Sequence, residues 1–143
     1  MNNSCSSIRA SLNTHLSAVT QLKQILVGRA TDVSQGFPAA RIYLVGIAND
    51  PIDNQPSDFR TYRFAIDIIQ ENTNKAKADA EADFEDAIDA VLDKLNSQWQ
   101  LPSSGTPTVD TTVIEVSQIR EVEWNTGPTL VCTILLSCKT LIY

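Results

Sequence analysis

Apolar residues recur at intervals of three and four along the first part of the chain, a spacing that places them on one side of a helix. The stripe consists of Ile8, Leu12, Leu16, Val19, Leu22 and Leu26. Ser7 is suited to cap the N-terminus of such a helix, and Gly28 is suited to end it. The pattern therefore predicts an amphipathic helix over residues 8–26.

Two strand-like segments follow. Residues 40–48 (ARIYLVGIA) are rich in branched and aromatic side chains, and residues 61–70 (TYRFAIDIIQ) alternate as a half-buried strand requires. The set expected to face the core is Tyr62, Phe64, Ile66 and Ile68. The set expected to face away is Arg63, Ala65 and Asp67.

The segment between these strands, residues 49–59 (NDPIDNQPSDF), is crowded with Asn, Asp and Pro, which favour turns and remove backbone donors. It predicts a long, exposed hairpin loop. Its charges can be ordinary loop polarity, or Asp50, Asp53, Asp58 and Arg60 can project toward a partner.

A second amphipathic helix is predicted over residues 77–95 (KADAEADFEDAIDAVLDKL). Its apolar stripe consists of Ala80, Phe84, Ala87, Ile88, Val91, Leu92 and Leu95. Seven carboxylates fill the rest of the segment. The simplest interpretation is a solvated face, and the alternative is an acidic surface along a path for DNA.

The last part of the chain predicts two long strands, residues 111–124 and 129–143, joined by a tight NTGP turn. The final strand has apolar residues on both sides, which suits a central position in a sheet. Trp124 ends the first of these strands and can be either a core residue or an interface anchor. Trp99 is expected to seal the end of the second helix.

The order helix-strand-strand-helix-strand-strand predicts an α+β fold, with about four mostly antiparallel strands and both helices packed on one face. We expect a single domain over residues 1–143, with residues 1–6 as a flexible leader. Two helices can cover only one face of the sheet, so the other face is expected to support self-association.

The composition is that of an ordinary globular protein, with 43% hydrophobic and 20% charged residues among 143. No apolar run approaches the ~20 residues that a membrane span needs, and the N-terminus lacks a signal-peptide pattern, so a soluble cytoplasmic product is expected. The net charge of −6 argues against a nucleic-acid-binding protein.

The three cysteines are expected to be free thiols. Cys132 and Cys138 lie six positions apart on one predicted strand, roughly 20 Å along it, which is too far for a disulfide. Both are expected to be packed inward, whereas Cys5 lies in the polar leader.

Each metal-binding, catalytic or phosphate-binding motif that the sequence suggests lacks a residue that the motif requires. Asp79, Glu81 and Asp83 match the start of an EF-hand loop, but Phe84 and Ala90 stand where Gly and Glu are needed. His15 is the single histidine, and its place beside the first apolar stripe is typical of a structural residue. The chain has no phosphate-binding glycine motif and no C-x-x-C pair. We expect no catalysis, metal or cofactor.

The whole chain resembles the tail terminator, or tail completion, proteins of long-tailed bacteriophages, the lambda tail terminator family. The resemblance lies in the helices SLNTHLSAVTQLKQILVG and ADFEDAIDAVLDKL, the strands FPAARIYLVG and YRFAIDIIQ, and the closing hairpin IREVEWNTGPTLVCTILLSCKTLIY. It implies a small protomer, assembled in the host cytoplasm, that forms a ring, expected to be a hexamer, at the tail-neck junction of the virion. This ring would cap the tail tube, end its polymerisation and join it to the head.

The partners that the resemblance implies are further copies of the chain, the tail-tube protein and a neck or head-completion protein. DNA would only pass through the ring, without specific binding, and no membrane is involved. The acids Asp79, Asp83 and Asp86 are candidates for the lumen, and Trp124 and the loop charges for partner contacts. Another neck or tail component, such as a head-tail connector or tail-tube protein, is the first alternative. The second is a small enzyme or ligand-binding domain that uses His15 or the helix acids, Glu85 included.

Overall fold

The computed structural model describes residues 3–29, 36–71, 77–96, 100–101, 109–124 and 127–143. These residues form two helices and seven strands. In chain order they are α1 (Cys5–Leu16), β1 (Gln24–Val27), β2 (Ala39–Pro51), β3 (Asp58–Glu71), α2 (Lys77–Asn96), β4 (Gln100–Leu101), β5 (Val109–Val116), β6 (Arg120–Trp124) and β7 (Gly127–Ile142).

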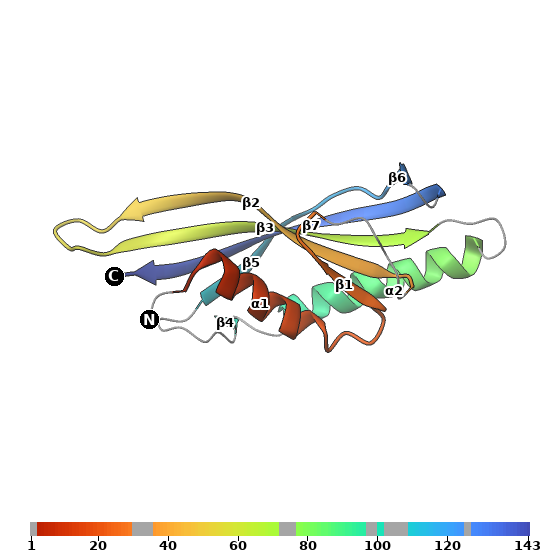
Figure 1. Ribbon diagram of the computed structural model, residues 1–143, viewed down its shortest axis with the longest axis horizontal. Helices are drawn as coiled ribbons and strands as arrows, with labels where there is room; N and C mark the ends of the chain where they lie inside the picture. The colour runs from red at the N-terminus through yellow and green to blue at the C-terminus, as the bar shows by residue number, and fades with distance from the viewer. Residues whose placement is uncertain (1–2, 30–35, 72–76, 97–99, 102–108, 125–126) are drawn as a thin grey trace.

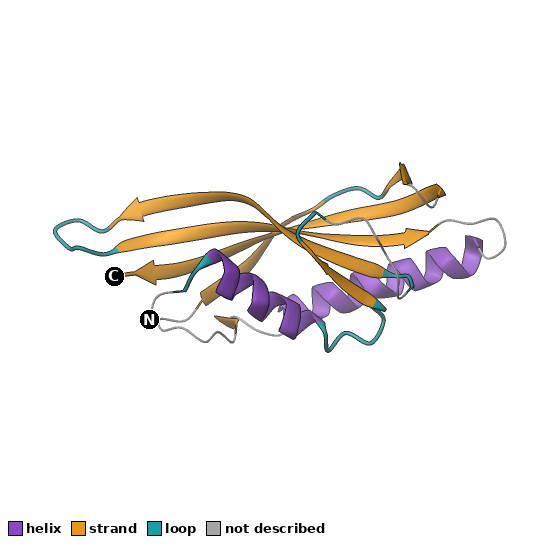
Figure 2. Cartoon of the chain, in the orientation of Figure 1, coloured by secondary structure: helices purple, strands orange, loops and turns teal. Residues whose placement is uncertain are grey.

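The molecule has two layers, a twisted sheet and a pair of helices on one side of it (Figures 1 and 2). The strand order is β1-β2-β3-β7-β5-β4, with β6 also paired to β7. The β1-β2 pair is parallel and every other pairing between described strands is antiparallel. The expected α+β class with both helices on one face is confirmed. The expected count of about four strands is wrong, because β1 and β4 are additional short strands and the strand predicted over residues 111–124 forms two, β5 and β6.

The first helix is shorter than predicted. Its N-cap is Ser4 rather than Ser7, because the Ser4 hydroxyl accepts from the Ser7 backbone N–H at 3.2 Å and the Ser7 hydroxyl accepts from the Ser4 N–H at 2.8 Å. The helix ends at Leu16, and the chain turns before it forms β1. The apolar stripe continues past this end because the turn residue Val19 remains buried against the same core.

The helix therefore begins inside residues 1–6, the predicted flexible leader. Asn3 is buried, and its amide nitrogen donates to the Thr140 hydroxyl at 3.2 Å. This contact fixes the start of α1 to the end of β7, so the leader prediction is wrong from Asn3 onward.

The first hairpin forms as predicted but is longer. Tyr62, Phe64, Ile66 and Ile68 are all buried against the helices. Pairing of β2 with β3 continues outward to Pro51 and Asp58, so only residues 52–57 form the loop. Asn54 has a φ of 61°, a left-handed conformation that asparagine tolerates well. Both ends of the predicted loop, residues 49–51 and 58–59, are therefore part of the strands.

The second helix and the central strand are confirmed. The stripe residues of α2 are buried, apart from a half-buried Leu92. Strand β7 lies between β3 and β5, and β6 pairs with its first half. The single strand predicted over residues 111–124 is broken into β5 and β6, since the chain is not paired as strand over residues 117–119.

Two β-bulges lie at the same level of the sheet. One interrupts β2 at Val45 and the other interrupts β5 at Ile114. They flank the directly paired residues Phe64 and Leu136 of the two central strands. Bulges increase local twist. Beyond this level, residues 47–62 and 139–143 form a narrow extension, here called the arm, that projects to the left in Figure 1.

Candidate assembly surfaces

The arm brings together four of the residues predicted to contact a partner. Asp50 and Asp58 lie on its two strands next to the tip, and Asp53 lies in the turn. Asp50 and Asp53 are exposed. Arg60 is half-buried and used internally, because its guanidinium donates to the Asn49 side chain and to the Tyr62 hydroxyl, each at 3.3 Å. The acids are therefore available to a partner, whereas Arg60 stabilises the arm.

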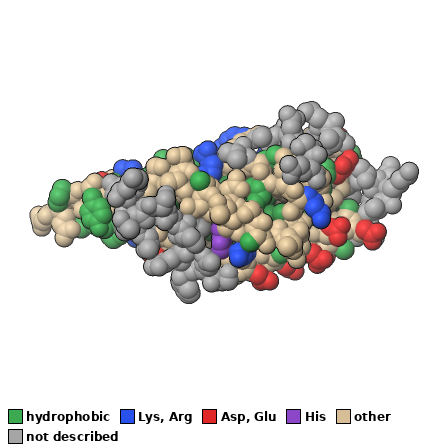
Figure 3. Space-filling model, turned by 60° about the horizontal axis from the view of Figure 1, so that its bottom comes forward, with side chains coloured by type: hydrophobic (Ala, Val, Ile, Leu, Met, Phe, Trp, Pro, Cys, Tyr) green, Lys and Arg blue, Asp and Glu red, His purple; other side chains and the backbone are tan. Residues whose placement is uncertain are grey.

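Large apolar side chains are also exposed on the arm. Ile47 is 55% exposed and Tyr143 is 73% exposed. Phe59 is 38% exposed, and the ammonium group of Lys139 lies 4.7 Å from its ring centre. Hydrophobic side chains are visible at the left end of the surface in Figure 3, where the arm lies. Sequence reasoning missed this feature, because the polar residues of the loop obscured the apolar residues beside it.

A second exposed apolar strip follows β5 and the connection to β6. It consists of Ile114, Val116 and Ile119. On the opposite side of the central strand pair, the bulge residue Val45 is also exposed. The uncovered apolar surface expected on the sheet is therefore concentrated on the arm and along β2 and β5–β6.

Trp124 is not part of the arm. Its backbone pairs with Gly127 at the start of β7, whereas the arm contains the end of β7, where Ile142 pairs with Asp58. At about 3.3 Å per residue, the two ends of β7 are on the order of 50 Å apart. The Trp124 side chain lies outside the described part of the structure, as does all of Trp99. A role for Trp124 as an interface anchor stays a prediction.

The seven carboxylates of α2 are all exposed, including the candidate lumen residues Asp79, Asp83 and Asp86. Acidic side chains follow the lower right edge of the view in Figure 3, along α2. Among the residues that the structure describes, no group of three His, Cys, Asp or Glu side chains is arranged to hold a metal ion. The helix presents its acids to solvent, and two of them, Asp83 and Asp86, line a surface hollow that also contains Lys23.

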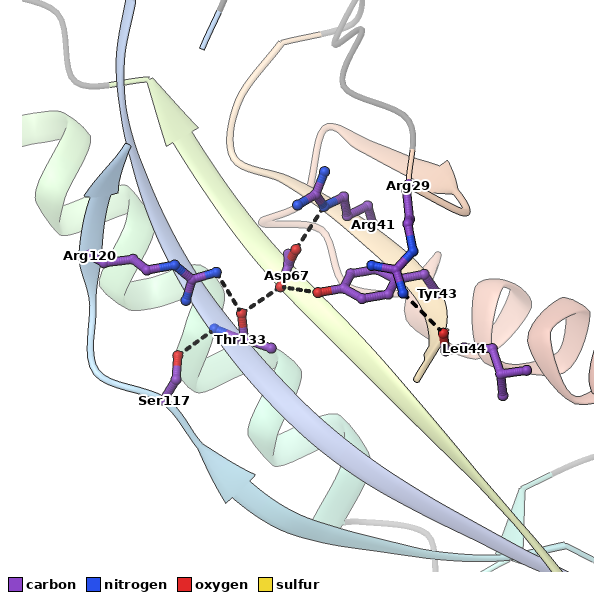
Figure 4. A network of polar contacts seen from close by, with 8 residues as sticks. All are labelled: Arg29, Arg41, Tyr43, Leu44, Asp67, Ser117, Arg120 and Thr133. Atoms are coloured by element: carbon purple, nitrogen blue, oxygen red, sulfur yellow. Dashed lines mark hydrogen bonds and ion pairs between the residues drawn. The ribbon is translucent and has the colours of Figure 1, made fainter. Parts of the chain in front are cut away.

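The opposite side of the molecule carries a network of arginines around one buried carboxylate (Figure 4). This side is the outer face, the face of the sheet that points away from the helices. Asp67 of β3 is 0% exposed there, and the Arg41 guanidinium donates to it at 2.7 Å. The Thr133 hydroxyl donates to the same carboxylate at 2.5 Å and the Tyr43 hydroxyl at 3.4 Å. Burial, with the nearby Asp67 charge, raises the pKa of Tyr43.

Two further arginines complete this network. Arg29, which follows β1, lies over the Tyr43 ring at 4.3 Å and donates to the Leu44 carbonyl at 3.4 Å. Arg120 of β6 donates to the Thr133 hydroxyl at 3.2 Å. Asp67 was correctly assigned to the face away from the core. Its burial was missed because its direct partners lie on two other strands, β2 and β7, that are distant from it in the chain.

His15 has a structural role. Its Nε2 donates to the backbone carbonyl of Lys94 at 3.1 Å and so joins the end of α1 to the end of α2. The imidazole lines an open groove of about 460 Å³ whose other lining residues are Ser7, Ala10, Ser11, Thr14, Ala18 and Lys94. None of the described residues that line this groove carries a carboxylate or a thiol, so the geometry favours the structural interpretation over a catalytic one.

Cys132 and Cys138 are buried in the core, as predicted, and all three cysteines are free. Burial raises the pKa of the Cys138 thiol to about 12 and also raises that of Cys132. Cys5 differs from its prediction, because it is half-buried as the first residue of α1 and packs against the core.

None of the helices in the described ranges is long and apolar enough to cross a membrane.

Comparison with known proteins identifies the fold. No protein-family model and no curated protein matches the chain. Among the matching solved structures is a chain of the virion of a native gene transfer agent particle, with a TM-score of 0.54 and 13% sequence identity. The match covers 94% of this chain and 94% of that chain. The two chains therefore share a fold along almost their whole length.

Proposed function

We propose that the protein is a structural component of a phage-like virion. The observation that carries this proposal is the fold shared with a chain of a gene transfer agent virion, with almost nothing left over in either chain. Exposed apolar groups on the arm and along β5–β6 support it, because such surfaces are typical of proteins that act within assemblies.

Within this class we propose a tail terminator. The protomers form a ring, expected to be a hexamer, that caps the tail tube, ends its polymerisation and joins the tail to the head or neck. This finer role rests on the resemblance of the sequence to tail terminators and on the arm, which offers a partner acidic and apolar groups at one projecting tip. The location is the tail-neck junction, and assembly occurs in the host cytoplasm.

The surfaces divide between partners as follows. The arm, with Asp50, Asp53 and Asp58, contacts the tail-tube protein or a neck or head-completion protein. The strip along β5–β6, with Trp124, contributes to contacts between copies. DNA passes through the ring without specific binding. In such a ring, the acids of α2 either line the lumen or contact cationic side chains of a neighbouring copy.

Electron microscopy of the purified protein tests the proposal, since closed rings of uniform diameter are expected. Particles made without the protein should have tails of unregulated length and heads that are not joined to them. A protein that remains a compact monomer at every concentration, or particles that mature normally without it, would contradict the proposed role.

Another neck or tail component, such as a head-tail connector or a tail-tube protein, is the second candidate. The matching structure is named only as a virion, without a component, and this observation keeps the second candidate open. Labelling the protein in intact particles separates the two. A tail terminator lies only at the head-proximal end of the tail, whereas a tail-tube protein lies along its whole length.

A further inference from the structure

The two layers of the protomer carry opposite charge. On the outer face, Arg29, Arg41 and Arg120 surround Asp67. The same face also carries Arg63 and Glu71, each four residues from Asp67 on β3, and the exposed Glu115, which pairs with Leu135. Four guanidinium groups therefore face three carboxylates. On the helix layer, the exposed acids are Asp79, Glu81, Asp83, Glu85, Asp86, Asp89 and Asp93. The protomer therefore carries a cationic patch on one side and an acidic helix on the other.

The cationic patch is organised before any partner arrives. Arg120 is exposed, and its guanidinium is held by the hydroxyl of Thr133, which is itself fixed by Asp67. Arg29 is exposed, but its guanidinium lies over the Tyr43 ring and donates to the Leu44 carbonyl. Side chains held in this way lose little conformational entropy when they bind. They suit recognition of carboxylates, because guanidinium and carboxylate groups form paired, charge-assisted hydrogen bonds.

We propose that this patch binds the carboxylate side of α2 from a second copy of the chain. The inference rests on the proposed ring and assigns the charged part of its subunit contact. The two contacting surfaces are different and lie on opposite layers, so the contact is head-to-tail. Repetition of a head-to-tail contact generates a ring when the rotation closes and a filament when it does not. The α2 acids are then used between subunits rather than in the lumen.

A second copy fits the patch better than nucleic acid does. The whole chain has a net charge of −6, and the four arginines of the outer face exceed its three acids by only one positive charge. A nucleic-acid site needs many phosphate contacts from clustered Lys and Arg. A row of seven carboxylates on the same molecule supplies the complementary charge without another partner.

Charge reversal tests the contact. The variants are Arg29→Glu with Arg120→Glu on the patch, and Asp83→Lys with Asp86→Lys on α2. Arg41 is left unchanged because it neutralises Asp67. Lys139→Glu, on the arm, is the matched control, since it reverses an outer-face charge away from the patch. Sedimentation at several salt concentrations measures self-association, and circular dichroism verifies folding.

In each of the two double variants, the dissociation constant between copies should rise about ten-fold or more. The Lys139→Glu control should assemble like the wild type. The wild-type contact should weaken as salt rises. An equimolar mixture of the patch variant and the α2 variant should recover part of the association. The unaltered patch of one variant meets the unaltered α2 of the other, and the two reversed surfaces are again opposite in charge.

Three outcomes would overturn the inference. If both charge-reversed variants form rings as the wild type does, this contact is excluded, while the proposed function is not contradicted. Duplex DNA binding that is lost in the Arg29→Glu, Arg120→Glu variant while rings persist assigns the patch to nucleic acid instead. A wild-type protein that never self-associates contradicts the contact and the ring together.

Discussion

The guanidinium of Arg41 lies 2.7 Å from the carboxylate of Asp67, on the sheet face opposite the helices. Asp67 has no exposed surface, and the Arg41 side chain is only 18% exposed. A buried charge without its partner is strongly destabilising, even though a buried pair is not always better than an apolar pair. The pair therefore holds both side chains on the outer face of β2 and β3, because separating them would leave the buried Asp67 charge unpaired.

The first prediction concerns this ion pair. Replacing Asp67 with Ala leaves the Arg41 guanidinium without its carboxylate and removes an acceptor from Tyr43 and Thr133. The free energy of unfolding should fall by about 3–5 kcal/mol, as measured by denaturant titration. Glu115→Ala, which removes an exposed acid from the same face, should change it by less than about 0.5 kcal/mol. Equal effects of the two substitutions would show that the Asp67 network adds nothing to stability.

The second prediction concerns alkaline pH. Burial raises the pKa of the Cys138 thiol to about 12, from an ordinary value of 9.0. The unfolded chain loses this proton at a lower pH than the folded chain, so stability should fall as pH rises from 9 toward 12. The slope that this thiol contributes is about 1.4 kcal/mol per pH unit. Denaturation of the wild type and of Cys138→Ala across this range should show a shallower decline in the variant. Parallel declines would contradict the predicted protonation.

The third prediction concerns thiol reactivity. Only the thiolate reacts readily, and burial raises the pKa of both Cys132 and Cys138. Both should remain unmodified by a thiol reagent at neutral pH until denaturant is added. Cys5 should react first, but more slowly than in the unfolded chain because it packs against the core. Mass spectrometry of the time course assigns each site. Early modification of Cys138 would mean that the end of β7 opens readily.

The fourth prediction concerns the tip of the arm. Replacing residues 53–56 with Asn-Gly should close β2 onto β3 through a two-residue turn without disturbing the core, because the Ile52 N–H already donates to the Ser57 carbonyl at 3.0 Å. Folding and ring formation should persist, but particles should show unjoined heads and tails. A second variant, Asp53→Asn, keeps the wild-type length of the turn and removes only the charge. It tests whether the charge or the shape of the tip is needed. Loss of rings in the shortened variant would assign the arm to contacts between copies.

The fifth prediction concerns the far end of the sheet. Trp124→Glu, in β6, should give a folded protomer that fails to form rings, because an unpaired carboxylate in an interface costs several kcal/mol. Trp124→Phe serves as the control and should assemble. Light scattering and circular dichroism measure the two properties separately. An unfolded Trp124→Glu protein would assign this tryptophan to the core instead.

Much of the two-layer architecture could be predicted from periodicity. The alternation of Tyr62, Phe64, Ile66 and Ile68 marks a buried strand face, and apolar residues on both sides of β7 mark a central strand. Periodicity could not locate the end of α1. Val19 continues the helical spacing from a turn and packs on the same core. Leu26 is also buried, but it pairs with Arg41 and so lies on the other face of the sheet. Spacing can therefore continue past the end of a helix without the same backbone conformation or the same buried face.

The candidate surfaces were harder to predict, because they depend on register and on contacts between distant segments. One inserted residue in β2, at Val45, changes which side chains share a face beyond it. The arginine network joins residues 29, 41 and 120 around Asp67, and an acid at that position of an alternating strand is typical of a solvated face. Only the pairing of strands brings these side chains together.

The central place of β7 also determines the order in which the chain can fold. Strand β7 pairs with β3, β5 and β6, yet it follows all three in the chain, and its ladder with β3 joins Asp58 to Ile142 and Glu71 to Thr129. Such distant pairings form slowly. During synthesis, the first hairpin and both helices can form early, but β3 retains an open edge until β7 leaves the ribosome. The nascent protein is therefore most prone to aggregate shortly before its last strand emerges, and any product truncated before β7 loses the strand that joins the two halves of the sheet.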